Sequence, residues 1–249
     1  LEEIARDFNT NWITATEMIS DRVYIGAENF SNLFCLRRNT TDTAEELRGR
    51  LDTVGEFHLG QMVNKFMKGS LIMPVSSNAK GSRRTTRRRG PASSPNAKQI
   101  DSSGGKAVKS FRPRVVVGSE TVFATVDGGI GMILGLDAST AAFFSSLERA
   151  MATMIEHVGG FDHQEHRAFQ GERRSHPSFG FVDGDLIESF LDLDREGMEL
   201  VVTEMNRDGR WDVDDMDVLD APEPSFESKP VDLEVDDVLA MVEEILMLH

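Results

Sequence analysis

Apolar and polar residues alternate along the first part of the chain, which is the pattern of half-buried β-strands. The alternation recurs in short segments separated by turn-forming residues, a spacing typical of an antiparallel meander in a propeller or a barrel. The segments are residues 12–19, 22–27, 32–37, 54–60 and 62–73. We therefore expect a sheet-rich unit from residue 1 to about residue 137.

A polar segment then interrupts the strand pattern. Residues 77–114 are rich in Ser, Gly, Pro and Arg and hold too few apolar residues to bury a core, so we expect this basic insert to be disordered. Strand character returns in residues 120–137, where Asp127, Gly128 and Gly129 are expected to supply the positive-φ residues of a tight hairpin turn. The insert is thus predicted to interrupt a sheet without ending it.

The hydrophobic period becomes helical at Ser139. Apolar residues recur at helical spacing as far as Val158, and two glycines follow, which predicts one long helix. Further helices are expected over residues 186–193, 196–206 and 235–246. An acidic insert, residues 207–231, separates the last two and is expected to be mobile. The predicted fold class is therefore β followed by α, which favours two units over one interleaved α/β fold.

The formal net charge of −15 conceals a strong asymmetry. Residues 77–114 hold 11 of the 27 Lys and Arg residues and a single acid, Asp101, so the rest of the chain carries −25. An acidic surface repels phosphates, and direct contact with nucleic acid is therefore expected only through the basic insert. Its arginine cluster is a candidate for nuclear import or nucleic-acid contact, and equally for a solvated loop. The cluster comprises Arg83, Arg84, Arg87, Arg88 and Arg89.

Cysteine and hydropathy narrow the expected compartment. The single cysteine, Cys35, excludes an internal disulfide and fits a reducing environment, while the apolar runs are too short for a membrane span. The chain begins without Met or a signal peptide, so we expect a segment of a larger protein. The nucleus or the cytoplasm is the expected location, with no membrane partner.

Four carboxylates in the stretch GFVDGDLIESFLDL raise the question of a calcium loop or an acid/base pair. An EF-hand that starts at Asp183 would need an oxygen ligand at its fifth position and Gly at its sixth, where Ile187 and Glu188 stand. Asp185 and Glu188 are instead predicted to begin a helix, the Asp accepting a backbone N–H and the Glu reaching back. We expect a structural role for this stretch.

Other motifs also fall short of catalytic patterns. The stretch VDGGIGMILGLD lacks the third glycine of a dinucleotide-binding turn, and no Gly-x-Ser-x-Gly elbow occurs. Four histidines gather after the long helix, but no cysteine accompanies them and no His-Glu-x-x-His pair exists. These are His157, His163, His166 and His176. We expect no enzyme, no metal site and no cofactor.

Collinear blocks along nearly the whole chain resemble one known family. The blocks are ARDFNTNWITATEMI, GAENFSNLF, VGEFHLGQMVNKFMKGSL, FATVDGGIGMI, GFVDGDLIESFLDL and DDVLAMVEEILMLH. They resemble the C-terminal region of the damaged-DNA-binding protein 1 family, the large adaptor subunits of cullin-4 ubiquitin ligases. Two related subunits, one of splicing and one of pre-mRNA cleavage and polyadenylation, share this region and its DGDL turn. A structural role in such a complex is therefore the alternative function, and the two inserts depart from the family pattern.

The resemblance implies that residues 1–137 are a partial antiparallel β-propeller, the closing blades of a seven-bladed one, and that residues 138–249 are the C-terminal helical domain. The whole would be a non-catalytic adaptor for DNA repair and protein ubiquitination. In the family, a propeller cleft grips a helical segment of a substrate receptor. The implied partners are WD40-type receptors, cullin-4 through a propeller missing from this chain, and a damaged-DNA-binding subunit that makes nucleic-acid contact mainly indirect. The implied location is the nucleus, and also the cytoplasm.

Carried over position by position, the cleft residues of the family correspond to five residues here. They are Arg6, Trp12, Met62, Asn64 and Val126, with Met62 standing where Phe is expected. Trp12 follows the loop-like sequence NTN, and an indole at the loop face of a propeller is an interface anchor of the kind that dominates binding. The alternative for Trp12 is a buried propeller core. We expect the five residues to hold a partner helix in a groove.

Overall fold

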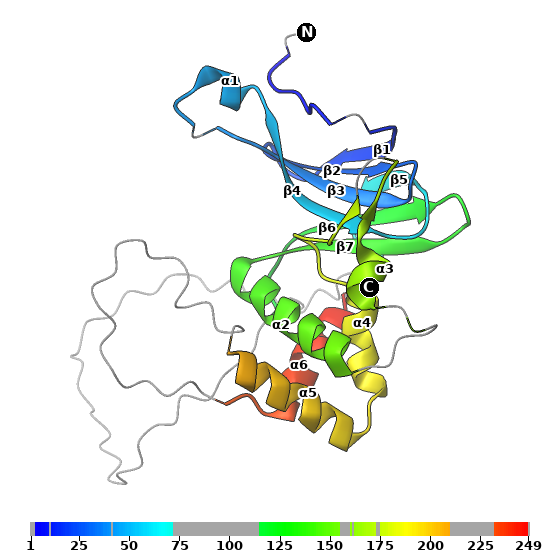
Figure 1. The fold of residues 1–249 in the computed structure, drawn as a ribbon, viewed down its shortest axis with the longest axis vertical. Coiled ribbons are helices and arrows are strands. Elements are labelled where there is room, and N and C mark those ends of the chain that lie inside the picture. The colour runs from blue at the N-terminus through cyan, green and yellow to red at the C-terminus, as the bar shows by residue number, and fades with distance from the viewer. Residues whose placement is uncertain are drawn as a thin grey trace, which may run out of the picture.

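The fold is taken from a computed structural model, which describes residues 3–9, 11–40, 42–71, 115–154, 160, 162–172, 175–209 and 232–248. The strands of the first 137 residues form one half of the molecule, and the helices that follow them form most of the other half (Figure 1). The predicted basic insert with its five arginines, residues 210–231 of the acidic insert, and His157 lie outside the described residues.

The first sheet is an antiparallel meander in which each strand pairs with the next. Its strands are β1 (Ile13–Met18), β2 (Val23–Glu28), β3 (Asn32–Arg38) and β4 (Leu51–His58). The alternating pattern predicted all four. β4 begins earlier than residue 54 because Leu51 and Asp52 pair with Arg38 and Arg37. The polar connection before β4 contains a short helix, α1 (Glu45–Arg48), that the sequence pattern did not predict.

The second sheet joins strands from both sides of the basic insert. β5 (Val63–Lys68) pairs with β6 (Val117–Thr125), which pairs with β7 (Ile130–Leu136), all antiparallel. The prediction that the insert interrupts a sheet without ending it is therefore confirmed. β5 ends at Lys68, short of the predicted residue 73.

The β6–β7 turn differs in detail from the prediction. Gly128 alone of the three expected turn residues has a positive φ, +91°. Gly129 is needed for a different reason, since a Cβ there would lie 2.7 Å from Gln61 Oε1 and 2.9 Å from Thr125 Oγ1. One left-handed glycine and one close approach thus shape this turn.

The two sheets pack face to face as neighbouring blades of a β-propeller that is not closed. Strands β1 and β5 lie side by side, and the apolar faces of the sheets share one core. The first sheet contributes Ile25, Leu33 and Phe57, and the second contributes Val63 and Phe66. Among the described residues β7 pairs only with β6, so its outer edge carries no strand. The predicted fold class, antiparallel sheets followed by helices, is confirmed.

The helical part follows β7 without a break. Its helices are α2 (Ala138–Met154), α3 (His163–Arg167), α4 (Gly184–Glu188), the 3₁₀ turn η2 (Ser189–Asp192), α5 (Arg195–Asp208) and α6 (Val235–Leu246). A second core is formed by their apolar faces, with Leu147, Phe190, Met205 and Val238 fully buried. The short strands β8 (Phe169–Gln170) and β9 (Ser175–His176) form a hairpin between α3 and α4.

The predicted helix start at Asp185 is wrong. Helix α4 begins at Gly184, so Asp185 lies inside the helix, exposed, while Asp183 precedes the first turn. The Asp183 carboxylate makes no capping hydrogen bond because it is engaged with His163 and Arg167. Helix α5 also extends into the segment expected to be mobile, and ends where Gly209 adopts φ +65°.

Candidate functional site

Two turns at the same end of the sheets are fastened in the same way to the residues that precede β1 and β5. The N–H of Asn29, in the β2–β3 turn, donates to the carbonyl of Trp12 over 3.1 Å. The N–H of Val126, in the β6–β7 turn, donates to the carbonyl of Met62 over 2.9 Å. Trp12 and Met62 therefore occupy equivalent positions, Trp12 directly before β1 and Met62 directly before β5.

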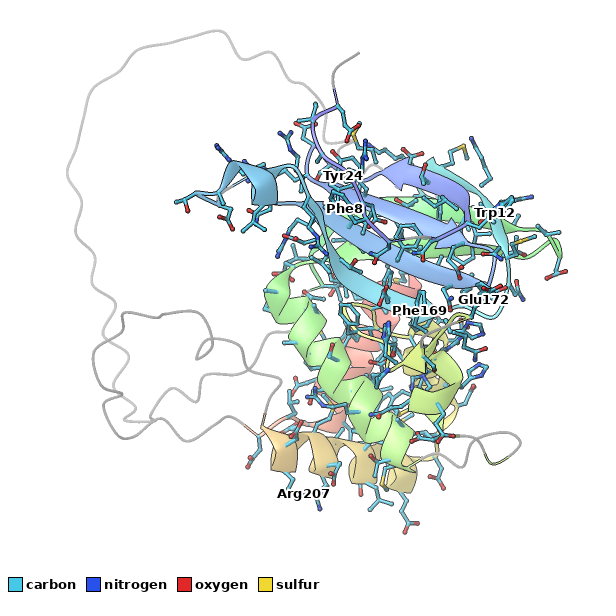
Figure 2. All side chains as sticks on the ribbon, turned by 45° about the horizontal axis from the view of Figure 1, so that its top comes forward. Phe8, Trp12, Tyr24, Phe169, Glu172 and Arg207 are labelled. Atoms are coloured by element: carbon cyan, nitrogen blue, oxygen red, sulfur yellow. The ribbon has the colours of Figure 1, made fainter. Side chains whose placement is uncertain are left out.

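Large apolar side chains are exposed at this end. Trp12 is 79 % exposed, Val126 54 % and Ile130 68 %, and Phe30 is also exposed. Figure 2 shows Trp12 at the margin of the sheets, far from the helical residue Arg207. We call this surface the rim, and it comprises Trp12, Phe30, Met62, Val126 and Ile130. Exposed apolar side chains gathered at one end of the sheets make the rim the candidate interaction site.

The structure brings four of the five predicted cleft residues to one end and leaves one apart. Trp12, Met62 and Val126 belong to the rim, with Met62 half-buried, and Asn64 is exposed near the start of β5. Arg6 instead lies beside the first residues of β4, where its N–H donates to Gly49 and its carbonyl accepts from Leu51. The Arg6 side chain pairs with Glu3.

Two residues of the rim were not predicted from the sequence. Phe30 lies in the turn between Asn29 and Ser31, and Ile130 follows two glycines at the start of β7. A large apolar residue next to turn-forming residues was the available signal, because such a side chain cannot easily turn into the sheet core.

A buried charge cluster joins the helical part to the last residues of β4. The Arg167 guanidinium donates from Nε to Asp183 Oδ2 over 2.6 Å and lies 4.9 Å from the centre of the Phe57 ring. Its Nη1 also points at the carbonyls of His58 and Leu59, 3.4 Å from each. Bonds to backbone as well as to a carboxylate fix a guanidinium in one orientation.

The same cluster holds two carboxyl groups with opposite shifts. Burial disfavours the charged form of Asp183 most strongly, yet the hydrogen bond from His163 and the charge of Arg167 together lower the pKa of Asp183. Burial raises the pKa of Glu148, whose Oε1 accepts the Asp183 N–H over 2.9 Å. One of the two carboxyl groups thus has a guanidinium and an imidazole as partners, and its neighbour accepts a backbone N–H.

The histidines that could have formed a metal site are dispersed. His163 binds Asp183, His176 Nε2 lies 2.8 Å from Glu56 Oε2, and His166 is exposed. His176 also stacks on Phe169, with ring centres 5.1 Å apart. Within the described ranges no group of three His, Cys, Asp or Glu side chains could hold a metal ion. Nor is any helix of those ranges long and apolar enough to cross a membrane.

The propeller-type sheets, the helical part and the shared residue pattern define a class. The chain belongs to the CPSF A subunit region family, which matches residues 1–192. It is 38 % identical over 206 residues, 83 % of this chain, to DNA damage-binding protein 1a of Arabidopsis thaliana. Over all 249 residues it is 33 % identical to DNA damage-binding protein 1b of the same plant and 34 % identical to DNA damage-binding protein 1 of Solanum lycopersicum.

These relatives are much longer than the chain described here. The chain spans 16 % of the length of the first relative and 17 % of the other two. The resemblance noted from the sequence blocks is therefore confirmed at the level of the family.

Proposed function

We propose that this chain is the receptor-binding end of a non-catalytic adaptor subunit of a cullin-4 ubiquitin ligase that serves DNA repair. The observation that carries the proposal is the indole of Trp12, 79 % exposed within the apolar rim. Relatives named DNA damage-binding protein 1 support it, because the chain aligns with them over its full length.

The chemistry of the rim suits a helical partner. Aromatic and aliphatic side chains that project from separate turns form the kind of surface that receives the apolar face of an amphipathic helix. Trp12 would be the anchor, since exposed tryptophans dominate binding energies at interfaces. Asn64 and Gln61, both exposed at the same end, would hydrogen-bond to the polar border of the helix.

The other partners follow from the whole adaptor. We assign the cullin-4 contact to another propeller of the parent protein, and we assign the rim to WD40-type substrate receptors. Damaged DNA would be recognised through a partner subunit, because this chain carries −25 outside residues 77–114 and repels phosphates. The nucleus, and also the cytoplasm, is the proposed location.

Replacement of the rim tryptophan tests the proposal. Trp12→Ala is expected to weaken binding of a synthetic helical peptide from a WD40-type receptor by about 2 kcal/mol, because the variant lacks the indole that the bound peptide would cover. Isothermal calorimetry with the wild-type and variant chains measures the difference. Thermal unfolding should be unchanged, since the indole is exposed.

Met67→Ala is the matched control, because Met67 is also 61 % exposed but lies near the far end of β5. It should leave the affinity unchanged. Equal affinities of the wild-type and Trp12→Ala chains would refute the proposed site.

The second candidate function is a structural role in a pre-mRNA splicing or polyadenylation complex. The description of the matching family, CPSF A subunit region, favours it. Affinity purification of the tagged parent protein separates the two functions. Cullin-4 and propeller-type receptors are expected in the eluate, whereas splicing or polyadenylation subunits in their place would support the second candidate.

A further inference from the structure

A buried amide connects the rim to the segment that follows α3. The side chain of Asn32, the first residue of β3, pairs with the backbone of Gln170 in β8 through two hydrogen bonds. Asn32 Nδ2 donates to the Gln170 carbonyl over 2.6 Å, and the Gln170 N–H donates to Asn32 Oδ1 over 3.2 Å. This pairing fixes which end of the amide is the oxygen.

The orientation of the Asn32 amide dictates the state of its neighbour. His58 Nδ1 lies 2.8 Å from Asn32 Oδ1, which can only accept, so this nitrogen carries a proton and donates. Burial, with the charges of His166 and Arg167, lowers the pKa of His58 and favours the neutral ring. The Asn32 amide therefore has hydrogen-bond partners on three strands: His58 on β4, Gln170 on β8 and Glu28 on β2.

The third side leads directly into the turn that carries Phe30. Asn32 Nδ2 also donates to Glu28 Oε1, and the same oxygen accepts the N–H groups of Phe30 over 3.1 Å and Asn32 over 3.3 Å. The N–H of Asn29, in this turn, is the group that holds the carbonyl of Trp12. Three hydrogen bonds in series thus join the Gln170 backbone to the N–H of Phe30, and the bond from the neighbouring Asn29 extends the connection to Trp12.

The turn is strained and depends on these contacts. Ser31 adopts φ +64°, a left-handed conformation that is unfavourable for a residue with a Cβ. Its carbonyl accepts the N–H groups of Leu59 and Gly60. A conformation of this kind persists only where the surroundings over-determine it, and it is found where geometry serves a function.

The Asn32 and Glu28 side chains are buried, so the loss of one of their hydrogen bonds is expected to weaken the whole network. Asn32 is 0 % exposed and Glu28 2 % exposed, so water cannot readily replace a lost partner. Removing one bond in such a network leaves a buried polar group unpaired, which is more unfavourable than the bond itself is favourable.

We propose that Asn32 is a positioning residue through which the β8 strand orders the turn at residues 29–31 and thereby the rim, so that seating of the helical part sets the affinity for the partner. The inference rests on the proposed function for its binding consequence, but not for the ordering itself. Phe169, which precedes Gln170, lies between the sheets and the helical part (Figure 2), where it is buried.

Amide hydrogen exchange on the full 249-residue chain tests the ordering. Asn32→Asp keeps the shape of the side chain but removes the donor that bonds to Glu28 and Gln170. Gln170→Pro acts from the opposite side: it removes the N–H that donates to Asn32 Oδ1, and it also fixes φ of residue 170. Each variant is expected to speed exchange at Asn29 and Phe30 by about tenfold or more, because each removes at least one buried hydrogen bond.

Asn206→Asp is the matched control. Asn206 makes the same double pairing with a backbone, its Nδ2 donating to the Leu233 carbonyl over 3.0 Å and its Oδ1 accepting the Leu233 N–H over 2.9 Å. It lies in α5, within the helical part. The control should leave exchange at Asn29 and Phe30 unchanged. If all three variants speed exchange alike, or if none does, Asn32 has no positioning role.

Peptide binding supplies the second readout. The receptor peptide used for Trp12→Ala is expected to bind Asn32→Asp and Gln170→Pro about tenfold more weakly, with wild-type affinity for Asn206→Asp. If Asn32→Asp and Gln170→Pro speed exchange at Asn29 and Phe30 but bind the peptide with wild-type affinity, the link between the ordering and the binding is overturned. A wild-type chain that binds no peptide would count against the proposed function, and the exchange result would still decide the ordering.

Discussion

Single residues at the junction of the sheets and helices show how charge is accommodated where water is excluded. Asp183 has His163 and Arg167 as partners, and those contacts outweigh the opposing effect of burial on its pKa. Glu148 Oε1 accepts the N–H of Asp183, and burial raises the pKa of the Glu148 carboxyl group. The stretch GFVDGDLIESFLDL, whose carboxylates raised the question of a calcium loop or an acid/base pair, lies at the junction of the sheets and the helical part.

Glu148→Gln should reveal this imbalance through its pH dependence. The raised pKa of Glu148 means that the native state holds its proton more tightly than the unfolded state does. Its contribution to stability is therefore complete below the ordinary value of 4.5 and is lost as pH rises through the native pKa. Gln keeps the acceptor for the Asp183 N–H without the charge.

Urea unfolding of the wild-type and Glu148→Gln chains, from roughly pH 4 to roughly pH 7, measures the difference in their free energies of unfolding. The Gln variant is expected to gain stability relative to wild type at the upper limit, and the gain should shrink on acidification. A constant difference across the window would contradict the assignment.

Among the secondary-structure elements, α5 has both ends defined by local chemistry. The Asp194 carboxylate accepts the N–H of Gly197 over 2.8 Å at the start of the helix, and Gly209 closes it in a left-handed conformation. The buried face carries Val201, Val202 and Met205. The capping residues bound the same segment that the apolar residues mark at helical spacing, which is why the sequence pattern located this helix correctly.

Asp194→Ala is expected to lower the free energy of unfolding by about 1 kcal/mol, because one N–H of the first turn loses its acceptor. Chemical denaturation followed by circular dichroism measures the change. Glu199→Ala, on the exposed face of the same helix, removes only a solvent-exposed pair with Arg195 and should have little effect. Equal losses in both variants would exclude a capping role.

Elements with a long hydrophobic period were predictable, and those held by tertiary contacts were not. The strands β1–β7 and the helices α2, α5 and α6 follow periods that a single sequence displays. Helix α3 and strands β8 and β9 are too short for a period, and the bonds that hold them come from Asn32, Glu56 and Asp183, distant in sequence. The position of Arg6 beside β4 likewise depends on a non-local contact.

The rim was only partly predictable for a related reason. Trp12, Met62, Asn64 and Val126 came from family resemblance rather than from periodicity. Phe30 became part of the same surface because Asn29 binds the Trp12 carbonyl, a contact that no local sequence pattern encodes. A family resemblance assigns a role to each residue separately, whereas the structure shows which of these residues lie on the same surface.

At the scale of the whole molecule, the two sheets differ in how their outer strands are covered. The outer strand β4 of the first sheet bonds through Glu56 to Phe179 in both directions, and β7 has no such partner in the described part of the chain. A cavity of about 630 Å³ lies against β7, and its lining combines Ile130–Leu136 with residues of the first sheet and of the segment 180–188. An uncovered strand beside an apolar hollow is a site for edge-to-edge association.

We expect the isolated chain to self-associate with rising concentration and to unfold over a broad temperature range. Ile130→Lys should reduce association, because a charge at a strand edge opposes pairing. Met67→Lys, at a similarly exposed position on β5, should leave the association unchanged. Sedimentation velocity over a concentration series gives the answer, and a sharply melting monomer at every concentration would rule out the edge as a contact.

The strands β5 and β6 are joined across residues 72–114 and yet pair in register, with Lys68 opposite Thr121. Both flanks of that segment are also tied to the helical part, since Ser70 Oγ donates to the Leu248 carbonyl and the Val115 N–H donates to Glu244. Closing a longer loop between fixed ends adds only about 0.6 kcal/mol for each doubling of its length. This junction, at the far end of the strands from Trp12, is therefore where evolution or an engineer can splice in a foreign sequence without disturbing the partner-binding surface.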